Sequence, residues 1–365
     1  MSSVLALPPA RRRPVALLAL ATGAALLLSA CGGSATAEPT ASAPVTHAPV
    51  IEAAKGAPPA PVVAPRWPLT GVTASEVATR PGLAVKIENS GEARPQTGLD
   101  QADIVWEEVV EGGISRFVAV YQSQVPAEVG PIRSVRPMDP AIVAPMHGLI
   151  AFSGGQPGFV QALKNAGVQT ISQDAGAAGF YRKKGVAPAP HNVYGTPQAF
   201  WDQADGGHSA SPAPQFVMAK HPEQASAVVS GGASTTVSVR LSGYAKPTWT
   251  WDAGTGTWLR AEGATPATVS SGARIAATNV VTLKVRLVNS GTVDPAGNPV
   301  PETVLDGTGD ATVSSGGHTV TGTWTKTGES AVLTLATPDG GVLTLAPGTT
   351  WVELVPQDSG SVTIG

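Results

Sequence analysis

The sequence predicts an α+β fold, with a layered mixed-sheet N-terminal domain followed by a β-rich C-terminal domain. Over residues 67–210, short apolar runs are mixed with helix-like stretches, which favours a sheet with helices packed on it. Over residues 237–358, segments of alternating polarity are separated by glycine-rich turns, which is typical of an all-β layer or half-barrel. A stretch rich in serine, glycine and alanine near 206–236 marks the boundary between the two parts.

Individual elements follow from the same patterns. In the N-terminal part, strands are expected over 83–87, 103–110, 114–122 and 149–153, and helices over 158–165 and 197–205. In the C-terminal part, strands are expected over 237–241, 248–251, 257–260, 279–287, 313–315, 319–326, 331–335, 342–345 and 351–355.

The composition excludes several classes of protein. The 365 residues carry 23 basic and 26 acidic side chains, a formal charge of −3, so nothing favours a nucleic-acid partner. A hydrophobic fraction of 42% is enough for a packed core. The single cysteine excludes an internal disulfide framework, and the histidines show no close ligand spacing. We therefore expect no metal site and no cofactor.

The first 31 residues have the features of an export signal. Three arginines at 11–13 precede an uncharged run of 17 residues, Pro14 to Ala30, which is short for a transmembrane helix and rich in small side chains. The run ends in Leu28-Ser29-Ala30-Cys31, which resembles the lipobox of bacterial lipoproteins. That resemblance implies a signal peptide over 1–30, a diacylglycerol on the Cys31 thiol, and a lipid-anchored protein on the extracytoplasmic face of the cell membrane. The alternative is an ordinary signal peptide or anchor with a cysteine there by chance.

Residues 31–66 are dominated by alanine, proline, threonine, serine and valine. Such a segment cannot bury enough apolar surface to fold. We expect a disordered tether between the lipid anchor and the folded part.

A predicted hairpin carries three glutamates. If Gly112-Gly113 is a two-residue turn, Glu107 lies opposite Val118, and alternation places Glu107, Glu111 and Arg116 on one face. This face is either a salt-bridged sheet surface or the polar wall of a site. Glu108 is expected on the other face beside Trp106 and Phe117, where desolvation would raise its pKa unless it is paired.

Two further segments carry cations. Arg133 and Arg136 lie between prolines, and guanidinium groups bind carboxylates and phosphates bidentately. On an extended segment the two point to opposite faces, so one is expected to pair with Glu107 or Glu108 while the other faces a ligand; purely structural pairing is the alternative. The second segment holds Arg182 in a basic run, followed by His191 and Asn192, where the histidine is either a general base or ligand, or a hydrogen-bonded structural residue.

Several longer motifs resemble one known family. They are Arg94 to Leu99, Gln101 to Glu108, Glu111 to Phe117, Gly130 to Pro137 and Pro190-His191-Asn192, with Asn279-Val280-Val281, Leu305 to Gly309, Thr323 to Lys326 and Pro347 to Trp351 in the C-terminal half. Over residues 67–356 the chain is similar to the YerB-like family of bacterial lipoproteins. The resemblance implies two domains of unknown function, over 67–210 and 237–358, with a layered α+β architecture. The family has no established catalytic residues.

Three functional hypotheses follow. In the first, a lipid-anchored protein binds a polar or anionic envelope component, such as a wall polymer, in a cleft lined by Glu107, Glu108, Glu111, Arg116, Arg133, Arg136, Arg182, His191 and Asn192. In the second, the protein is a hydrolase of envelope carbohydrate or phosphodiester that uses a glutamate as acid/base. In the third, it is a scaffold that docks another envelope protein through an exposed apolar patch or open strand edge of the β-rich half.

Overall fold

The computed structural model of the chain describes residues 63–365. The predicted signal peptide, Cys31 and nearly all of the predicted tether lie outside these residues. Within 63–365, no helix has the length and apolar character needed to span a membrane.

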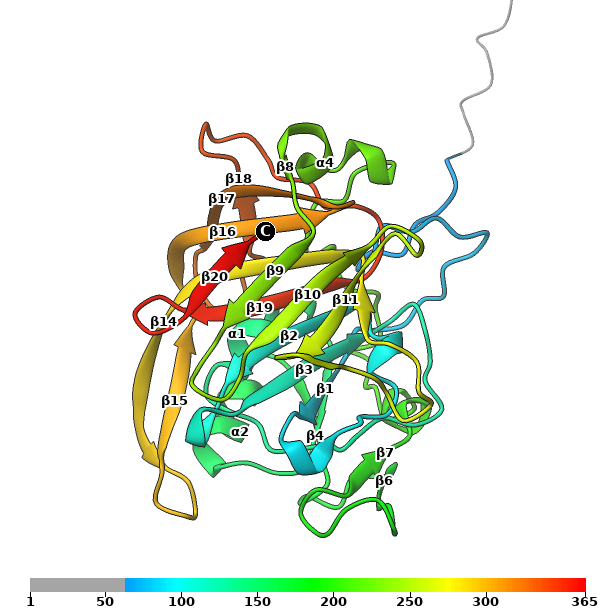
Figure 1. Cartoon of the computed structure of the whole chain (residues 1–365). Coiled ribbons are helices and arrows are strands. Elements are labelled where there is room, and N and C mark those ends of the chain that lie inside the picture. The colour runs from blue at the N-terminus through cyan, green and yellow to red at the C-terminus, as the bar shows by residue number, and fades with distance from the viewer. Residues whose placement is uncertain (1–62) are drawn as a thin grey trace, which may run out of the picture. The chain divides into compact units, whose positions relative to one another are not determined.

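The N-terminal half contributes five neighbouring strands to a large mixed sheet (Figure 1). They are β1 (Leu83–Glu88), β2 (Ile104–Val109), β3 (Ser115–Tyr121), β4 (Leu149–Phe152) and β5 (Gln169–Ser172), in the order β2-β3-β1-β4-β5. Every residue of β1 to β4 is buried, including the charged ones. Strands that are covered on both faces are near-continuous apolar runs, and this is why the sequence shows runs rather than alternation here.

The C-terminal half completes the same sheet with seven more strands. They are β8 (Gly232–Ala233), β14 (Asn279–Val293), β15 (Pro299–Val304), β16 (Gly307–Ser315), β17 (His318–Lys326), β18 (Thr334–Ala336) and β19 (Thr350–Pro356). Strand β19 joins the halves, because it runs parallel to β14 on one side and to β2 on the other, with Trp351 opposite Val105. The sheet is therefore continuous across the two ranges that the sequence analysis treats as domains, and those domain boundaries stay a prediction.

A second sheet of six strands comes from the C-terminal half alone. Its strands are β9 (Thr236–Arg240), β10 (Pro247–Asp252), β11 (Thr257–Glu262), β12 (Thr265–Pro266), β13 (Ala276–Ala277) and β20 (Ser361–Ile364). The side chains of Val237, Trp249 and Trp258 belong to the same buried cluster as Phe117 and Trp351 of the large sheet. The six-stranded sheet thus covers one face of the large one.

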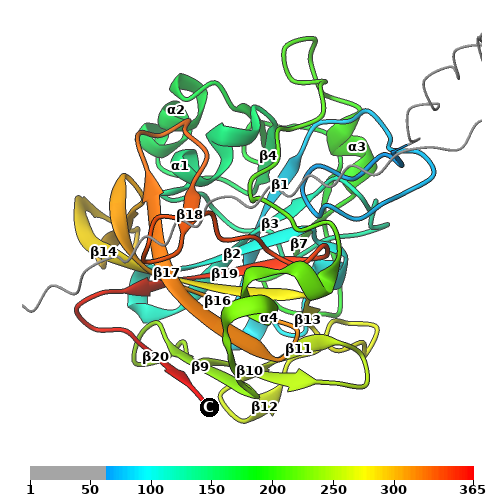
Figure 2. The same ribbon diagram turned by 90° about the horizontal axis from the view of Figure 1, so that it is seen from above.

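The helices are short. They are α1 (Asp139–Val143), α2 (Pro157–Asn165), α3 (Pro197–Trp201) and α4 (Ser226–Ser230), and a small hairpin is formed by β6 (Phe180–Arg182) and β7 (Val193–Gly195). Figure 2 shows α1 and α2 on the side of the large sheet opposite β9, β10 and β11. Apolar residues of α1 and α2, among them Ile142 and Leu163, pack in a second buried cluster with Trp106 and Val118.

The expected mixed, sheet-rich fold is confirmed, and the division into a layered N-terminal domain and a β-rich C-terminal domain stays a prediction. Strands form at nearly every predicted position. The strands that were not predicted are β5, β6, β7, β15, β20, the first half of β16 and the two-residue strands β8, β12 and β13. The predicted strand over 342–345 makes only isolated bridges, from Val342 to Ala336 and from Leu345 to Met218. The predicted helix over 197–205 ends at Trp201.

Candidate functional site

The hairpin of β2 and β3 has a different register from the predicted one. Residues Glu111–Gly113 form a 3-10 turn in which both glycines have positive φ, so the connection is longer than two residues. Glu107 therefore lies opposite Phe117, and Glu108 lies opposite Arg116. A shift of one residue exchanges the two faces of a strand. The predicted shared face of Glu107 and Arg116 is wrong, as is the predicted place of Glu108 beside Phe117.

Three arginines gather on the Glu108 face of the sheet. Arg116 comes from β3, and Arg133 and Arg136 come from the segment that follows Pro131. This segment runs beside β1, since the Glu88 N–H donates to Pro131 O (2.9 Å) and the Arg133 N–H donates to Lys86 O (2.8 Å). We call Arg116, Arg133 and Arg136 the guanidinium cluster.

Two of these arginines have carboxylate neighbours, and neither neighbour is the predicted Glu107 or Glu108. Arg136 forms an ion pair with Glu111: its Nη2 donates to Oε2 at 2.7 Å, and its Nε lies 2.6 Å from Oε1 without forming a hydrogen bond. Arg133 Nε lies 3.4 Å from Oε1 of Glu88, a residue of β1. Hydrogen bonds between two charged groups are stronger than neutral ones, so Arg136 is the partner of Glu111.

Arg116 differs from the other two because it has no carboxylate partner. Its side chain is buried, its Nη1 donates to Ser134 O at 2.9 Å, and its Nε has no hydrogen-bond partner. Within residues 63–365, no acidic side chain forms an ion pair with it. Burial, with repulsion from Arg136 and Arg133, lowers the pKa of Arg116 to about 10. A buried guanidinium with free donors beside two like charges is a favourable place for an anion.

The solvent-facing side of the cluster is formed by His191 and Arg133, whose side chains are 23% and 20% exposed. His191 Nδ1 lies 2.8 Å from Glu88 Oε1, the same oxygen that accepts from Ser90 Oγ at 3.1 Å. Asn192 follows His191, and its Oδ1 accepts from Arg182 Nη1 at 2.8 Å. The basic run of the β6–β7 hairpin therefore borders the guanidinium cluster.

Deeper on the same face, a fully buried lysine binds two carboxylates. Lys86 Nζ donates to Asp139 Oδ1 at 2.6 Å and to Glu108 Oε1 in a shorter contact, and all three side chains have no exposed surface. Burial and repulsion from Asp139 raise the pKa of Glu108 to about 7. One cation against two carboxylates leaves an excess negative charge unless one of them holds a proton. Glu108 is thus a structural partner of Lys86, with no access to a ligand in solvent.

Glu107 belongs to a second charge cluster on the opposite face. Arg260 belongs to β11. Its Nη2 lies 2.9 Å from Glu107 Oε2 and 2.8 Å from Glu262 Oε1, and its Nη1 lies 3.3 Å from Glu353 Oε1. Its guanidinium carbon lies 4.8–5.5 Å from the ring centres of Trp351, Phe117 and Trp249. This cluster joins the two sheets, because Glu107 and Glu353 belong to the large sheet and Arg260 to the smaller one.

The protonation of this second cluster follows from its charges. Burial alone lowers the pKa of Arg260, but Glu107, Glu262 and Glu353 outweigh burial and raise that pKa above its ordinary value. Burial and repulsion from Glu107 raise the pKa of Glu353 well above its ordinary value. Arg260, Glu107 and Glu353 have no exposed surface, so this cluster is a structural one.

The nine predicted site residues do not all lie together in the structure. It brings Glu111, Arg116, Arg133, Arg136 and His191 into one neighbourhood with Asn192 and Arg182 at its border, places Glu108 beneath it, and puts Glu107 on the other face. Sequence reasoning missed Glu88, Lys86, Asp139, Arg260 and Glu353. The available signal was a charged residue inside an otherwise apolar strand pattern, as in Leu83–Glu88, where Lys86 and Glu88 alternate with Val85 and Ile87.

Two family models match the chain. One is described as the N-terminal domain of a protein of unknown function, DUF3048, and matches residues 69–210; the other is the DUF3048 C-terminal domain and matches residues 237–352. The chain belongs to the DUF3048 family. The resemblance inferred from the motifs is thereby confirmed.

One curated relative and one solved structure are similar to this DUF3048 chain. The relative is "Putative lipoprotein YerB" from Bacillus subtilis (strain 168), 38% identical over 129 residues, which are 35% of this chain and 39% of the relative. The matched stretch thus spans about two fifths of the relative's length. The crystal structure of the YerB protein from Bacillus subtilis has a TM-score of 0.68 at 24% identity, covering 82% of this chain and 99% of that one. This likeness shows a shared fold.

Proposed function

We propose that this DUF3048 protein is a lipoprotein on the extracytoplasmic face of the cell membrane that binds an anionic group of an envelope polymer at the guanidinium cluster. The observation that carries the proposal is Arg116, a buried arginine without a carboxylate partner among residues 63–365. Arg133 and His191 give the site its solvent-facing side. Phosphate and carboxylate groups both match the planar fork of a guanidinium, so either group can occupy this site.

The lipid anchor is supported by the sequence Leu28-Ser29-Ala30-Cys31 and by the lipoprotein name of the relative from Bacillus subtilis. Two or more acyl chains would hold the protein stably at the membrane, where one chain would not.

We expect Cys31→Ala to abolish lipid attachment. Cells fed a palmitate analogue that can be labelled should give a labelled wild-type chain in the membrane fraction and an unlabelled Cys31→Ala chain. The matched control is Ser34→Ala, a small substitution three residues downstream. Label that persists in Cys31→Ala, or no label in the wild-type chain, would contradict the anchor.

Arg116→Met should weaken polymer binding at least about tenfold, since a hydrogen bond to a charged group contributes about 1.5–3 kcal/mol and 1.4 kcal/mol corresponds to a factor of ten. Binding of poly(glycerol phosphate), polygalacturonate and neutral dextran to the full-length chain in non-ionic detergent should be compared by thermophoresis. We expect binding of at least one polyanion, no binding of dextran, and a similar loss in Arg133→Met.

The control for this experiment is Arg286→Met, which removes an exposed arginine of β14 and the same formal charge. Thermal unfolding of each variant separates loss of binding from loss of folding. Equal affinities of Arg116→Met and Arg286→Met, or equal binding of dextran and the polyanions, would refute the proposal.

The hydrolase and scaffold hypotheses have less support from the structure than anion binding has. The hydrolase hypothesis needs a glutamate that meets a substrate, but Glu107 and Glu108 have no exposed surface and lie on opposite faces of the sheet. The scaffold hypothesis stays a prediction.

A further inference from the structure

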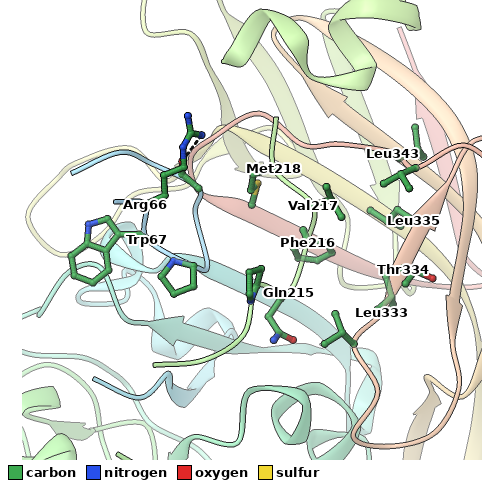
Figure 3. A pocket seen from close by; sticks show the side chains of 15 residues that line it. Arg66, Trp67, Gln215, Phe216, Val217, Met218, Leu333, Thr334, Leu335 and Leu343 are labelled. Carbon is green, nitrogen blue, oxygen red and sulfur yellow. Dashed lines mark hydrogen bonds between the residues drawn. The ribbon is translucent and has the colours of Figure 1, made fainter. Parts of the chain in front are cut away.

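An apolar pocket of about 590 Å³ lies apart from both charge clusters, and none of their residues lines it. Figure 3 shows it between the first described turn of the chain, with Arg66 and Trp67, and the segments that carry Phe216, Met218 and Leu335. Its volume is in the range of about 300–1,000 Å³ that is usual for small-molecule sites. Its lining is mostly apolar, and the site is unrelated to the proposed polymer binding.

The pocket is open to solvent, and apolar side chains lie exposed at its mouth. Val217 is 55% exposed and Val342 is 62% exposed, and both line the pocket. Apolar surface that remains in contact with water is a source of binding free energy for an apolar ligand.

The backbone around the pocket is already paired. Leu343 N–H donates to Leu335 O of β18 (3.0 Å), and Leu345 N–H donates to Val217 O (2.9 Å). Ala219 N–H in turn donates to Leu345 O (2.8 Å). A peptide that binds as an added strand needs unpaired backbone groups, and the groups that form these three hydrogen bonds are already occupied. The pocket therefore favours a ligand that needs no backbone hydrogen bonds.

One fixed positive charge lies at the rim. Arg66 Nη1 donates to Gly71 O (3.1 Å) and Ala219 O (3.3 Å), and Nη2 donates to Lys220 O (3.0 Å). These three carbonyls hold the guanidinium in place without neutralising it, and no acidic side chain within 63–365 pairs with it. An apolar cavity with a preorganised cation at its rim is complementary to an amphiphile with an anionic head.

We propose that this pocket binds one acyl chain of an anionic membrane phospholipid, with the lipid head group at Arg66. Arg66 lies only 35 positions after Cys31 in the sequence, and it lines the pocket. An anchor at Cys31 would keep the pocket within reach of a lipid surface, but lipid binding itself does not depend on the polymer site.

The test uses the full-length chain in vesicles that contain a phospholipid with a photoreactive acyl chain. One set carries the probe as phosphatidylglycerol and the other as phosphatidylcholine. After irradiation, the cross-linked peptides are mapped by mass spectrometry. We expect cross-links on residues 214–218 and 332–343, at least about fivefold more with phosphatidylglycerol.

Val217→Asp combined with Val342→Asp should abolish these cross-links, because it places two carboxylates at the mouth of the pocket. Both side chains are exposed, so folding should be unaffected, and thermal unfolding checks this. The control is Val229→Asp combined with Val293→Asp, which are 70% and 58% exposed and do not line the pocket. Cross-links confined to other peptides, or unchanged in Val217→Asp/Val342→Asp, would overturn the proposal. Equal cross-linking by both lipids would overturn the role of Arg66.

Discussion

Replacement of Arg260 with methionine should lower the free energy of unfolding by about 3–5 kcal/mol, the usual cost of removing one member of a buried ion pair. Methionine keeps much of the side-chain volume but leaves Glu107 and Glu353 buried without their cation. It also removes a cation from three aromatic rings, where such contacts contribute up to about 2 kcal/mol when desolvated. Urea unfolding of the wild-type and variant chains measures the difference.

Two further variants make this result interpretable. Arg260→Met combined with Glu107→Gln and Glu353→Gln should recover part of the loss, because no unpaired charge then remains in the interface between the sheets. Arg240→Met, an exposed position on β9, should change the free energy of unfolding by less than about 0.5 kcal/mol. If Arg260→Met unfolds no more easily than Arg240→Met, the cluster does not hold the two sheets together.

Lys86→Met should also cost about 3–5 kcal/mol, since Glu108 and Asp139 would share a buried site with no cation between them. The double variant Lys86→Met/Glu108→Gln should be more stable than Lys86→Met alone, because only one buried carboxylate remains. Asp139 would keep the hydrogen bond that it accepts from the Arg136 N–H at 2.6 Å. Denaturant unfolding of the single and double variants gives the coupling free energy. Strictly additive effects would contradict a shared charge cluster.

The pH dependence of stability should report on the carboxyl group of Glu108. The pKa of Glu108 is raised from 4.5 to about 7 in the folded state. Between these values the folded chain binds more protons than the unfolded chain, so this carboxyl lowers stability as the pH rises through the window, by up to about 3 kcal/mol. Glu108→Gln should therefore gain stability relative to the wild-type chain on going from about pH 5 to pH 8. The cost of Lys86→Met should in turn shrink at the acidic end.

Much of this protein follows from sequence alone, because the patterns involved are local. An apolar run such as Leu83–Glu88 indicates a strand that is buried on both faces, and an alternating segment such as Val237–Leu241 indicates a strand that is buried on one face. Both patterns predict a strand without knowledge of the strands that pair with it. The motifs around Arg116, Arg133 and His191 likewise predict the family, which the two family models confirm.

What the sequence did not determine depends on contacts between distant residues. A glycine pair fits a two-residue turn and a longer 3-10 turn equally well. The two turns differ by one residue in the strand register, and this difference decides whether Glu107 or Glu108 lies on the same face of the sheet as Arg116. The parallel pairing of β19 with β2 brings Glu353 beside Glu107, 246 positions earlier in the chain, and local periodicity carries no information about such a pairing. Only the tertiary structure therefore separates Arg260, which pairs with carboxylates of both sheets, from Arg116, which has no carboxylate partner within residues 63–365.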